Sequence, residues 1–489
     1  MKTIKILLVL IILGLGIFLR LHKIDNPIAE WHSFRQADTA SVTKNFINNN
    51  FIDILHPTYH DLSNVQSGKD NPKGYRMVEL PIYNALCAAT HNFFKSIPID
   101  IFSRYISIFI TIITAIFIFL ISKQITHQYL PSLFSLIIFL TLPYNIFYSR
   151  SILPEPTAVL LMTISLYFFP RNLLVSAIAL SLAVLIKPYV AIILFPTCLF
   201  YIYKFYLNKK IHFLNLLLFL VISFLPFFLW RQWIKQFPTG IPSSNWLFND
   251  STNPVVQQWV HGYNLTWLNK MVAFRPHWFE WLFLNRISNL ILGSYGLIPL
   301  FLGLAYRKKS SQPILFSFIF GIILYFAIVA QGNIQHDYYQ YLISPQIAII
   351  TGIGFYYLYN FIFKNKILSI FSLAIIYTFT LFFSWQQIKN YYKINNPIII
   401  DAGKKVDEIT PKNALIIAPY TGDTAFLYQT NRSGWPIEIY PETLPQLKIE
   451  HSQNPIYLVS VNFDKYTNDI TPKYKTLYKN DKFIILDLN

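Results

Sequence analysis

Long apolar segments recur along most of this chain. Between Ile4 and Trp385 there are many windows of about 18 to 22 mostly apolar residues, each long enough to cross a hydrocarbon core of about 30 Å as a helix. The chain is 54% hydrophobic and only 13% charged over 489 residues. Several soluble domains would need more charge, so we predict a protein that crosses a membrane several times.

The N-terminal segment is predicted to be the first span rather than a cleaved signal peptide. Lys2 and Lys5 precede an apolar run that closes at Arg20, and no small-residue cleavage site follows it. The net charge of +17 comes largely from Lys and Arg clusters between apolar segments, which is a topology signal and not a nucleic-acid signature. Cys87 and Cys198 lie far apart in apolar surroundings, so neither a disulfide nor a thiolate metal site is expected.

Topology depends on the weakly apolar segment 79–95. If it crossed the membrane, the clusters Lys209–Lys210, Arg307–Lys309 and Lys364/Lys366 would all lie outside the cytoplasm, against the positive-inside rule. We therefore expect 79–95 to be an interfacial helix. The predicted spans are 4–20, 101–122, 129–147, 157–169, 172–187, 188–205, 211–230, 288–305, 313–331, 341–362 and 366–386.

The predicted fold class is an all-α polytopic membrane protein of about eleven spans with a small C-terminal α/β domain. The N-terminus is then cytoplasmic and residues beyond Trp385 are extracytoplasmic, in the plasma membrane. We expect a transmembrane domain over 1–390, with outer loops at 21–100 and 231–287, and a soluble domain over 391–489. In that domain Ala414–Tyr420 and Ile456–Val461 are predicted strands, 401–409 and 422–430 helical turns, and Lys479–Asp481 a hairpin turn.

Carboxylates stand at the predicted outer ends of apolar elements. Asp38, Glu79 and Glu155 each occupy such a position, where burial is costly unless the group is paired or has a function. Two of them have a simpler reading, since Glu155 is placed to cap the span that follows it and Asp38 to cap a helix beginning at Thr39. Surface roles remain equally open for further polar residues near the outer face, which are Glu30, His32, Arg35, His336 and Asp337.

Basic residues beside outer span ends are exceptions to the positive-inside rule. Arg104 opens a span, Arg150 precedes Glu155, and Lys187 ends a span, while Arg275 and His277 lie in the large loop. Each one alone is explained by snorkelling or by a structural ion pair. As a group they are predicted to bind an anion at the membrane surface, for which a lipid-linked phosphate is the obvious candidate.

The order of these motifs resembles that of the GT-C glycosyltransferases, in the branch of the lipid A aminoarabinose transferases and protein O-mannosyltransferases. Asp38-Thr39-Ala40 is similar to the Asp-Glu motif of the family's first loop, although Thr39 replaces the second acidic residue. Leu80 and Glu155 also replace the family's Lys and Asp. The resemblance covers about residues 1–390 and is carried further by Val78–Ile82, Glu155, Ile186-Lys187-Pro188 and His336–Pro345.

The resemblance implies an inverting transferase that takes a sugar from a polyprenyl-phosphate-linked donor on the extracytoplasmic face. Asp38 would be the catalytic base. Glu79 and Glu155 would position the acceptor or bind a divalent metal ion, and the acceptor would be a glycan, a lipid or a protein. The residues expected to bind the donor phosphate or substrate are Lys187, Arg150, Arg104, Arg275, His277, Tyr339 and Tyr341.

Two other function classes remain open from the sequence. A flippase or transporter for lipid-linked saccharides would show discontinuous spans and polar residues at the middle of the membrane, often in paired halves, whereas the polar residues here gather at one predicted face. A glycan polymerase or ligase would centre on Arg and His in a large outer loop, and Arg275-Pro276-His277 fits that pattern.

Overall fold

The structure is a computed structural model that describes residues 2–208, 213–243, 276–306, 311–362 and 364–489. Its contacts divide the chain into two compact units. The helical unit comprises Met1–Ile24, Tyr105–Arg231 and Ser244–Asn390. The α/β unit comprises Asp25–Arg104, Gln232–Ser243 and Tyr391–Asn489.

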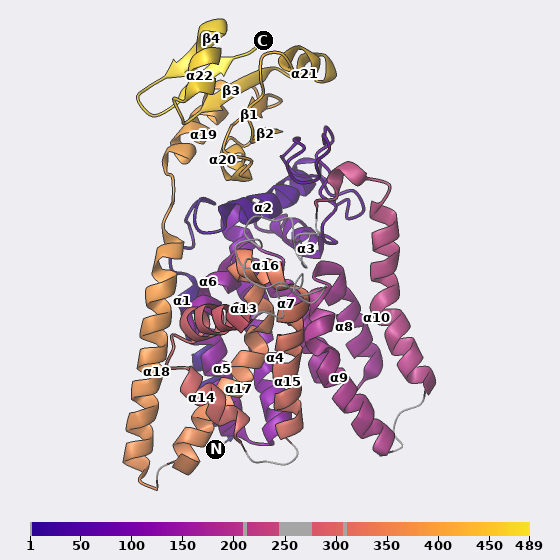
Figure 1. The fold of residues 1–489 in the computed structure, drawn as a ribbon, viewed down its shortest axis with the longest axis vertical. Coiled ribbons are helices and arrows are strands. Elements are labelled where there is room, and N and C mark those ends of the chain that lie inside the picture. The colour runs from indigo at the N-terminus through magenta and orange to yellow at the C-terminus, as the bar shows by residue number, and fades with distance from the viewer. Residues whose placement is uncertain (1, 209–212, 244–275, 307–310, 363) are drawn as a thin grey trace. The chain divides into compact units, whose positions relative to one another are not determined.

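The helical unit contains the long apolar helices that the sequence predicts (Figure 1). Its helices are α1 Lys2–Arg20, α4 Ile99–Thr126, α5 Tyr129–Thr141, α6 Pro143–Arg150, α7 Glu155–Phe168, α8 Leu173–Ile186, α9 Tyr189–Leu207, α10 Phe213–Ile234, α13 Pro276–Trp281, η4 Leu282–Ile291, α14 Leu297–Leu304, α15 Gln312–Ile328, α16 Ala330–Gln335, η5 Asp337–Ile343, α17 Ser344–Tyr357, η6 Leu358–Ile362, α18 Lys366–Ile388 and η7 Lys389–Tyr392. Three of them, α4, α10 and η7, extend by a few residues into the segments of the α/β unit.

Six helices among the described residues are long and apolar enough to cross a membrane, or up to seven if the bent pair α5 and α6 forms one span. Three shorter apolar helices, α7, α8 and α15, coincide with further predicted spans. The total of about eleven stays a prediction. Of the inner basic clusters, Lys209–Lys210 and Arg307–Lys309 lie outside the described residues, as does much of the 231–287 loop.

The predicted span 288–305 is interrupted. Its helix η4 ends at Ile291 and α14 begins at Leu297, so the continuous helix that we expected is replaced by two short ones. Gly293 between them has φ 52°, and a Cβ there would lie 2.3 Å from the Thr380 carbonyl oxygen of α18. The break therefore places a glycine where the backbones of two segments approach closely.

Helix α17 packs against α5 and α14 in the middle of the helical unit. The window Asp337–Ile362, which includes α17, is 94% buried, far more than the other long apolar helices. Gly354 permits this packing, since a Cβ there would meet the Pro299 carbonyl oxygen of α14 at 1.6 Å. Small residues at such contacts let membrane helices approach closely.

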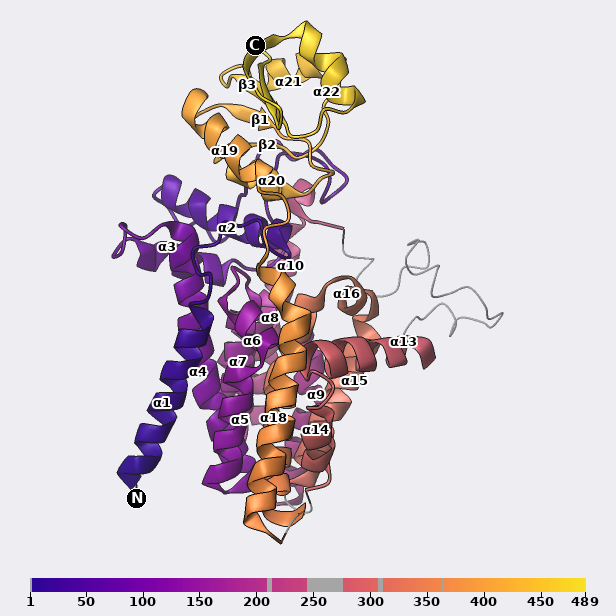
Figure 2. The ribbon, with the colours of Figure 1, turned by 90° about the vertical axis from the view of Figure 1, so that its left-hand side faces the viewer.

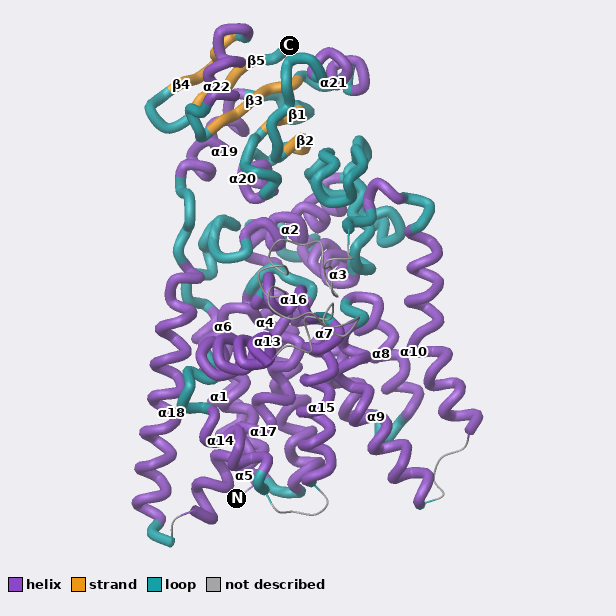
Figure 3. Tube along the Cα trace, viewed as in Figure 1, coloured by secondary structure: helices purple, strands orange, loops and turns teal. Residues whose placement is uncertain are grey.

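The α/β unit is built on one mixed sheet, with the strands gathered near the C-terminus (Figure 3). The strand order is β2-β1-β3-β5-β4, with β1 parallel to β2 and β3, and β5 antiparallel to β3 and β4. The elements of this unit are α2 Ser33–Asn48, α3 Ile82–His91, η1 Pro238–Gly240, α19 Ile398–Ile409, β1 Leu415–Ile417, α20 Thr424–Gln429, β2 Ser433–Trp435, α21 Leu444–Glu450, β3 Ile456–Ser460, α22 Lys465–Ile470, η8 Thr471–Lys473, β4 Lys475–Lys479 and β5 Ile484–Asp487.

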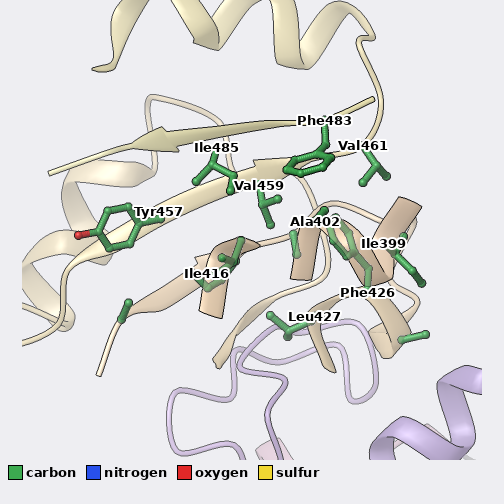
Figure 4. Packing of buried hydrophobic residues seen from close by; sticks show 14 of the residues in the cluster. Ile399, Ala402, Ile416, Phe426, Leu427, Tyr457, Val459, Val461, Phe483 and Ile485 are labelled. Atoms are coloured by element: carbon green, nitrogen blue, oxygen red, sulfur yellow. The ribbon is translucent and has the colours of Figure 1, made fainter. Parts of the chain in front are cut away.

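Consecutive residues of the central strands are apolar, and successive side chains of a strand point to opposite faces of the sheet. Both faces of this sheet are therefore apolar. On one face Ile416, Val459 and Ile485 pack against α19 and α20 (Figure 4). On the other face Leu458 and Leu486 pack in a second cluster with residues of α21 and α22. The predicted strands at 414–420 and 456–461 are present in shorter form, and the turn Lys479–Asp481 joins β4 to β5 as predicted.

The first loop shares the core of the C-terminal region. Ala29 belongs to the cluster on one face of the sheet and Leu62 to the cluster on the other. The backbone of Gly434 in β2 accepts a hydrogen bond from Leu62 N at 2.8 Å and donates one to the His60 carbonyl at 2.9 Å. Residues 391–489 therefore share a core with part of the first loop, and the domain boundary at residue 390 stays a prediction.

Within the first loop, α3 packs on α2 (Figure 2). Val42, Phe46, Tyr59 and Ala88 form a small apolar cluster. Helix α3 has only 10 residues, which is a length of about 15 Å and too short for a hydrocarbon core. This length agrees with the interfacial interpretation of segment 79–95 and excludes a helical span there.

Candidate functional site

Asp38 lies inside helix α2 and not at its start. The helix begins at Ser33, after His32 has turned the chain with a left-handed φ of 54°. Asp38 therefore does not cap a helix beginning at Thr39, which removes the simpler explanation for this carboxylate. Helical spacing places Arg35, Asp38 and Val42 on one face of α2.

The Asp38 carboxylate is buried and held from both sides. It is 1% exposed. Arg76 Nη2 lies 2.8 Å from its Oδ2, and the Thr424 hydroxyl of α20 donates to its Oδ1 at 2.7 Å. A buried carboxylate needs such partners, since an unpaired charge at this depth would be strongly destabilising. The arrangement fixes the orientation of the carboxylate.

Arg76 and Thr424 were not predicted from the sequence. Arg76 lies in the loop after Gly74, with its guanidinium 5.0 Å from the centre of the Tyr59 ring. Its Nε and Nη1 are buried and have no hydrogen-bond partner among the described residues. Arg76 thus has donors left for a ligand beside Asp38. The sequence signal for Arg76 was a lone cation in an outer loop, which is weak by itself.

A second ion pair lies next to Asp38. Arg35 Nη2 contacts Glu79 Oε1 at 2.5 Å, so two of the predicted site residues are brought together with Asp38. Asn84 of α3 fixes α2 by donating to the Thr39 carbonyl at 2.6 Å. These groups line a small cavity. It is lined by Arg35, Asp38, Thr39, Val42, Pro57, Arg76, Glu79, Pro81 and Asn84.

Glu30 and Arg104 pair with each other. Arg104 Nη2 lies 3.1 Å from Glu30 Oε1, both side chains are fully buried, and Arg104 also donates to the Asn26 carbonyl at 2.5 Å. This is the pattern of a structural ion pair. His32 makes edge contacts with the rings of Trp31 and Phe34, at 5.1 and 5.9 Å between centroids.

Titratable groups around Asp38 are shifted toward their neutral forms. Burial lowers the pKa of His60 to about 4, and His60 Nε2 lies 3.1 Å from the Thr424 carbonyl. Burial, with a contribution from the Asp38 charge, raises the pKa of Asp423 to about 6. Burial also raises the pKa of Asp61. The surroundings of Asp38 therefore disfavour additional charge.

The helical unit contains a separate group of predicted residues. Glu155 is the first residue of α7, and Lys187 follows the last residue of α8, which packs against α7. Lys187 Nζ lies 2.7 Å from Glu155 Oε1 and 5.6 Å from the centre of the Tyr339 ring. Glu155 thus has both a helix N-terminus and an ammonium group to stabilise its charge.

Asp337 is surrounded by tyrosines. Its carboxylate accepts a short hydrogen bond from Tyr148, and its carbonyl accepts one from Tyr144 at 2.7 Å. Arg286 Nη1 lies 3.7 Å from its other carboxylate oxygen. Asp337 is thus buried and paired, which argues against a solvated turn. The neighbouring predicted residues His336, Tyr339 and Tyr341 share this region, where His336 stacks on Tyr339 at 6.0 Å and Tyr341 is buried.

The other predicted phosphate ligands are placed differently. Arg150 is fully buried and donates to the Lys23 carbonyl at 3.0 Å. Arg275 lies outside the described residues, and His277 is the second residue of the short helix α13. Lys187, by contrast, contacts both the Glu155 carboxylate and the Tyr339 ring of its own unit.

The donor set does not favour a metal ion. Within the described ranges no three His, Cys, Asp or Glu side chains gather as metal ligands. The two carboxylates predicted as possible ligands, Glu79 and Glu155, each contact a cationic side chain instead. A carboxylate that is paired with a cationic side chain is a poor ligand for a divalent metal, so these residues do not fit such a site.

No protein-family model and no curated protein sequence matches this chain. Its structure is similar to that of ArnT from Cupriavidus metallidurans bound to undecaprenyl phosphate, with a TM-score of 0.61 and 10% identity over 99% of this chain and 97% of the other. The apo state of the same protein gives 0.62. The archaeal oligosaccharyltransferase AglB from Archaeoglobus fulgidus, in complex with an inhibitory peptide and a dolichol-phosphate, gives 0.55 at 12% identity, over 94% of this chain and 69% of that one.

These similarities extend over nearly the whole chain, including the C-terminal region that the sequence resemblance did not reach. ArnT and AglB are both GT-C glycosyltransferases. The predicted GT-C fold is therefore confirmed, whereas identities this low say nothing about the substrates of this chain.

Proposed function

From its GT-C fold and the buried, doubly held Asp38, we propose that this protein is an inverting glycosyltransferase that uses a polyprenyl-phosphate-linked sugar. ArnT was solved with undecaprenyl phosphate and AglB with a dolichol-phosphate, which supports a lipid-phosphate carrier as the donor. The observation that carries the proposal is the Asp38 carboxylate, held by Arg76 and Thr424 beside a cavity.

In the proposed reaction Asp38 takes the proton of the acceptor hydroxyl. The hydroxyl oxygen attacks the anomeric carbon, the bond from that carbon to the phosphate oxygen breaks, and polyprenyl phosphate leaves with its electron pair. A single displacement inverts the anomeric centre. Each Asp38 oxygen has more than one lone pair, so either can accept the proton while its present partner stays in contact.

The departing phosphate needs cations. We assign this role to Arg76, whose Nε and Nη1 have no hydrogen-bond partner among the described residues. Within the helical unit, Lys187 and Tyr339 keep the donor-binding role that the sequence predicts. Glu79 and Glu155 then position acceptor or donor through Arg35 and Lys187 instead of binding a metal. Arg104, which is buried against Glu30, and Arg150 are given structural roles.

An extracytoplasmic location of Asp38 is also proposed. The α/β unit joins the first loop, residues 232–243 and the C-terminal region, which are three segments that the charge pattern places outside. Segments that share one core must lie on the same side of the membrane, and the predicted topology places an even number of spans between each two of them. The sugar, and whether the acceptor is a lipid, a glycan or a protein, stay open.

The test is transfer by the purified full-length protein, with polyprenyl-phosphate sugars as donors and membranes of the native cells as acceptors. Asp38→Asn should lower the rate by about 10²- to 10⁴-fold while the protein stays folded, since the amide still accepts the Thr424 hydrogen bond. Asp423→Asn is the matched control, because Asn retains the cap of α20 and the change removes a neighbouring carboxylate.

Undiminished transfer by the Asp38→Asn protein would remove Asp38 from the reaction. If reconstituted protein moved lipid-linked sugars across vesicles without transferring them, the transporter hypothesis would replace the transferase.

A further inference from the structure

The α/β unit contains a second polar cavity, distinct from the one at Asp38. It has a volume of about 530 Å³ and lies between the C-terminal end of α2, the loop that connects α3 to α4, and two loops of the C-terminal region. Four cationic side chains line it, and no carboxylate is among its lining residues. The cations are Lys44, Lys95, Lys412 and Arg432.

The positive charge of this cavity is only partly neutralised. Lys412 Nζ and Arg432 Nη1 share one carboxylate oxygen, Asp407 Oδ1, at 2.7 and 2.5 Å. Arg432 uses its other donors on the carbonyls of Pro411 and Thr410, so it holds the loops together and supplies a fixed charge. Two cations against one carboxylate leave an excess of one charge before the remaining lysines are counted.

Lys44 adds a further, half-buried cation. Its ammonium lies 3.8 Å from the centre of the Tyr428 ring. Burial lowers the pKa of Lys44, against the attraction of Asp100 and Asp407, because the surroundings disfavour its charged form. An anion in the cavity would compensate this cost directly. Lys95 is exposed at the rim.

A buried histidine in the same cavity has one unused nitrogen. His91 is 9% exposed, and its Nε2 lies 2.9 Å from the Ile97 carbonyl, so Nε2 carries the hydrogen. Nδ1 is then a hydrogen-bond acceptor in the neutral ring, and it has no partner among the described residues. Buried polar atoms rarely lack partners, so the geometry favours a ligand that offers a hydroxyl group here.

We infer that this cavity binds a phosphate group attached to a hydroxyl-bearing body, such as a phosphorylated sugar or the headgroup of a phospholipid. Lys44, Lys95 and Lys412 would contact the phosphate oxygens, and His91 Nδ1 would accept from a hydroxyl. The inference rests on contacts within the α/β unit and does not depend on the proposed transfer reaction. A phosphorylated acceptor and an anionic lipid of the membrane are its two possible sources.

The test measures binding to the purified full-length protein with three probes: glucose 1-phosphate, dihexanoyl phosphatidylglycerol below its micelle concentration, and inorganic sulfate, which carries no proton at neutral pH. Lys95→Gln, at the exposed rim, should weaken the tightest probe by about tenfold. Lys44→Gln should weaken it at least as much. Lys475→Gln, in the exposed edge strand β4, is the matched control and should bind as wild type does.

The two phosphate probes distinguish the sources, since the one bound more tightly identifies a glycan phosphate or a lipid headgroup. His91→Phe, which keeps a ring against Phe102, should abolish any preference of the protein for these probes over sulfate. Absence of saturable binding by all three probes would overturn the inference. Equal weakening by Lys95→Gln and Lys475→Gln would also overturn it, because the attraction would then be that of a generally basic surface.

Discussion

Two buried ion pairs in this protein have the same chemistry and different origins. Glu155 and Lys187 meet because α7 and α8 follow one another in the chain and pack together. Asp38 instead meets Arg76 from a loop and Thr424 from a helix 386 residues away. The first pair can form as soon as a helical hairpin forms, whereas the second requires the first loop and the C-terminal region to fold as one unit.

The largest expected effect tests the hairpin pair. Lys187→Met leaves the Glu155 carboxylate buried without its cation and should destabilise the protein by about 3–5 kcal/mol. The double variant Glu155→Gln/Lys187→Met removes both charges and should recover most of that loss. Chemical denaturation in detergent, followed by tryptophan fluorescence, measures both. Equal destabilisation by the single and double variants would mean that packing, not charge pairing, holds α7 against α8.

The corresponding change in the Asp38–Arg76 pair should lower the free energy of unfolding by a smaller amount. Arg76→Met leaves Asp38 with the Thr424 hydroxyl as a remaining partner, so we expect a loss of about 2–3 kcal/mol. The same denaturation measurement applies, and Arg35→Met, which removes the guanidinium that contacts Glu79 nearby, is the control for a general effect of removing a guanidinium. If Arg76→Met lowered the stability more than Lys187→Met does, the Asp38–Arg76 pair would contribute more to stability than the Glu155–Lys187 pair.

The sequence predicted those parts of the molecule that depend on local patterns. The lengths of the long apolar helices, the strands at 414–420 and 456–461, the hairpin turn at Lys479–Asp481 and the position of Glu155 at the start of an apolar helix all follow from periodicity, turn chemistry and charge. The interrupted span at 288–305 carried a signal as well, since Gly293-Ser294 is a turn dipeptide inside an apolar run. The prediction of a continuous span rested on the length of the apolar run alone.

The partners of Asp38 could not be predicted in this way. Thr424 appeared only as part of a helical turn at 422–430, and nothing in its local sequence connects it to a residue in the first loop. Arg76 was one cation among many in a basic chain. Contacts of such sequence separation are determined by which apolar faces cover the sheet, as the inclusion of Ala29 and Leu62 in its two clusters illustrates.

The pH dependence of stability tests the surroundings of the long-range pair. The pKa of His60 is about 4 in the folded protein and 6.5 when unfolded. The unfolded chain therefore binds more protons between these values, so stability is lost as the pH falls from 6.5 toward 4. At pH 5 the loss from this group is about 2 kcal/mol.

His60→Gln removes this titration and keeps a neutral side chain that can hydrogen bond to the Thr424 carbonyl. The melting temperature of the wild type should fall more between pH 7 and pH 5 than that of the variant. Because Asp423 titrates nearby with a raised pKa, its contribution runs the opposite way, and it is present in both proteins. Parallel pH profiles for the two proteins would contradict the buried, neutral state of His60.

The smallest change tests whether the distant helix matters for the reaction or only for the fold. Thr424→Val preserves the shape of the side chain and removes the hydroxyl that orients Asp38, at a cost of about 1 kcal/mol in stability. If Asp38 is the base, its misorientation should lower kcat by about tenfold with little change in KM, since the hydroxyl is not expected to touch substrate. Thr424→Ser retains the hydroxyl and should keep most of the activity.

A fall in kcat for the valine variant but not for the serine variant would make α20 a positioning element of the site, so that the C-terminal region would be part of the catalytic machinery. Equal rates for wild type, valine and serine would leave α20 with a purely structural contact to α2, and the long-range pair would then differ from the hairpin pair only in its folding.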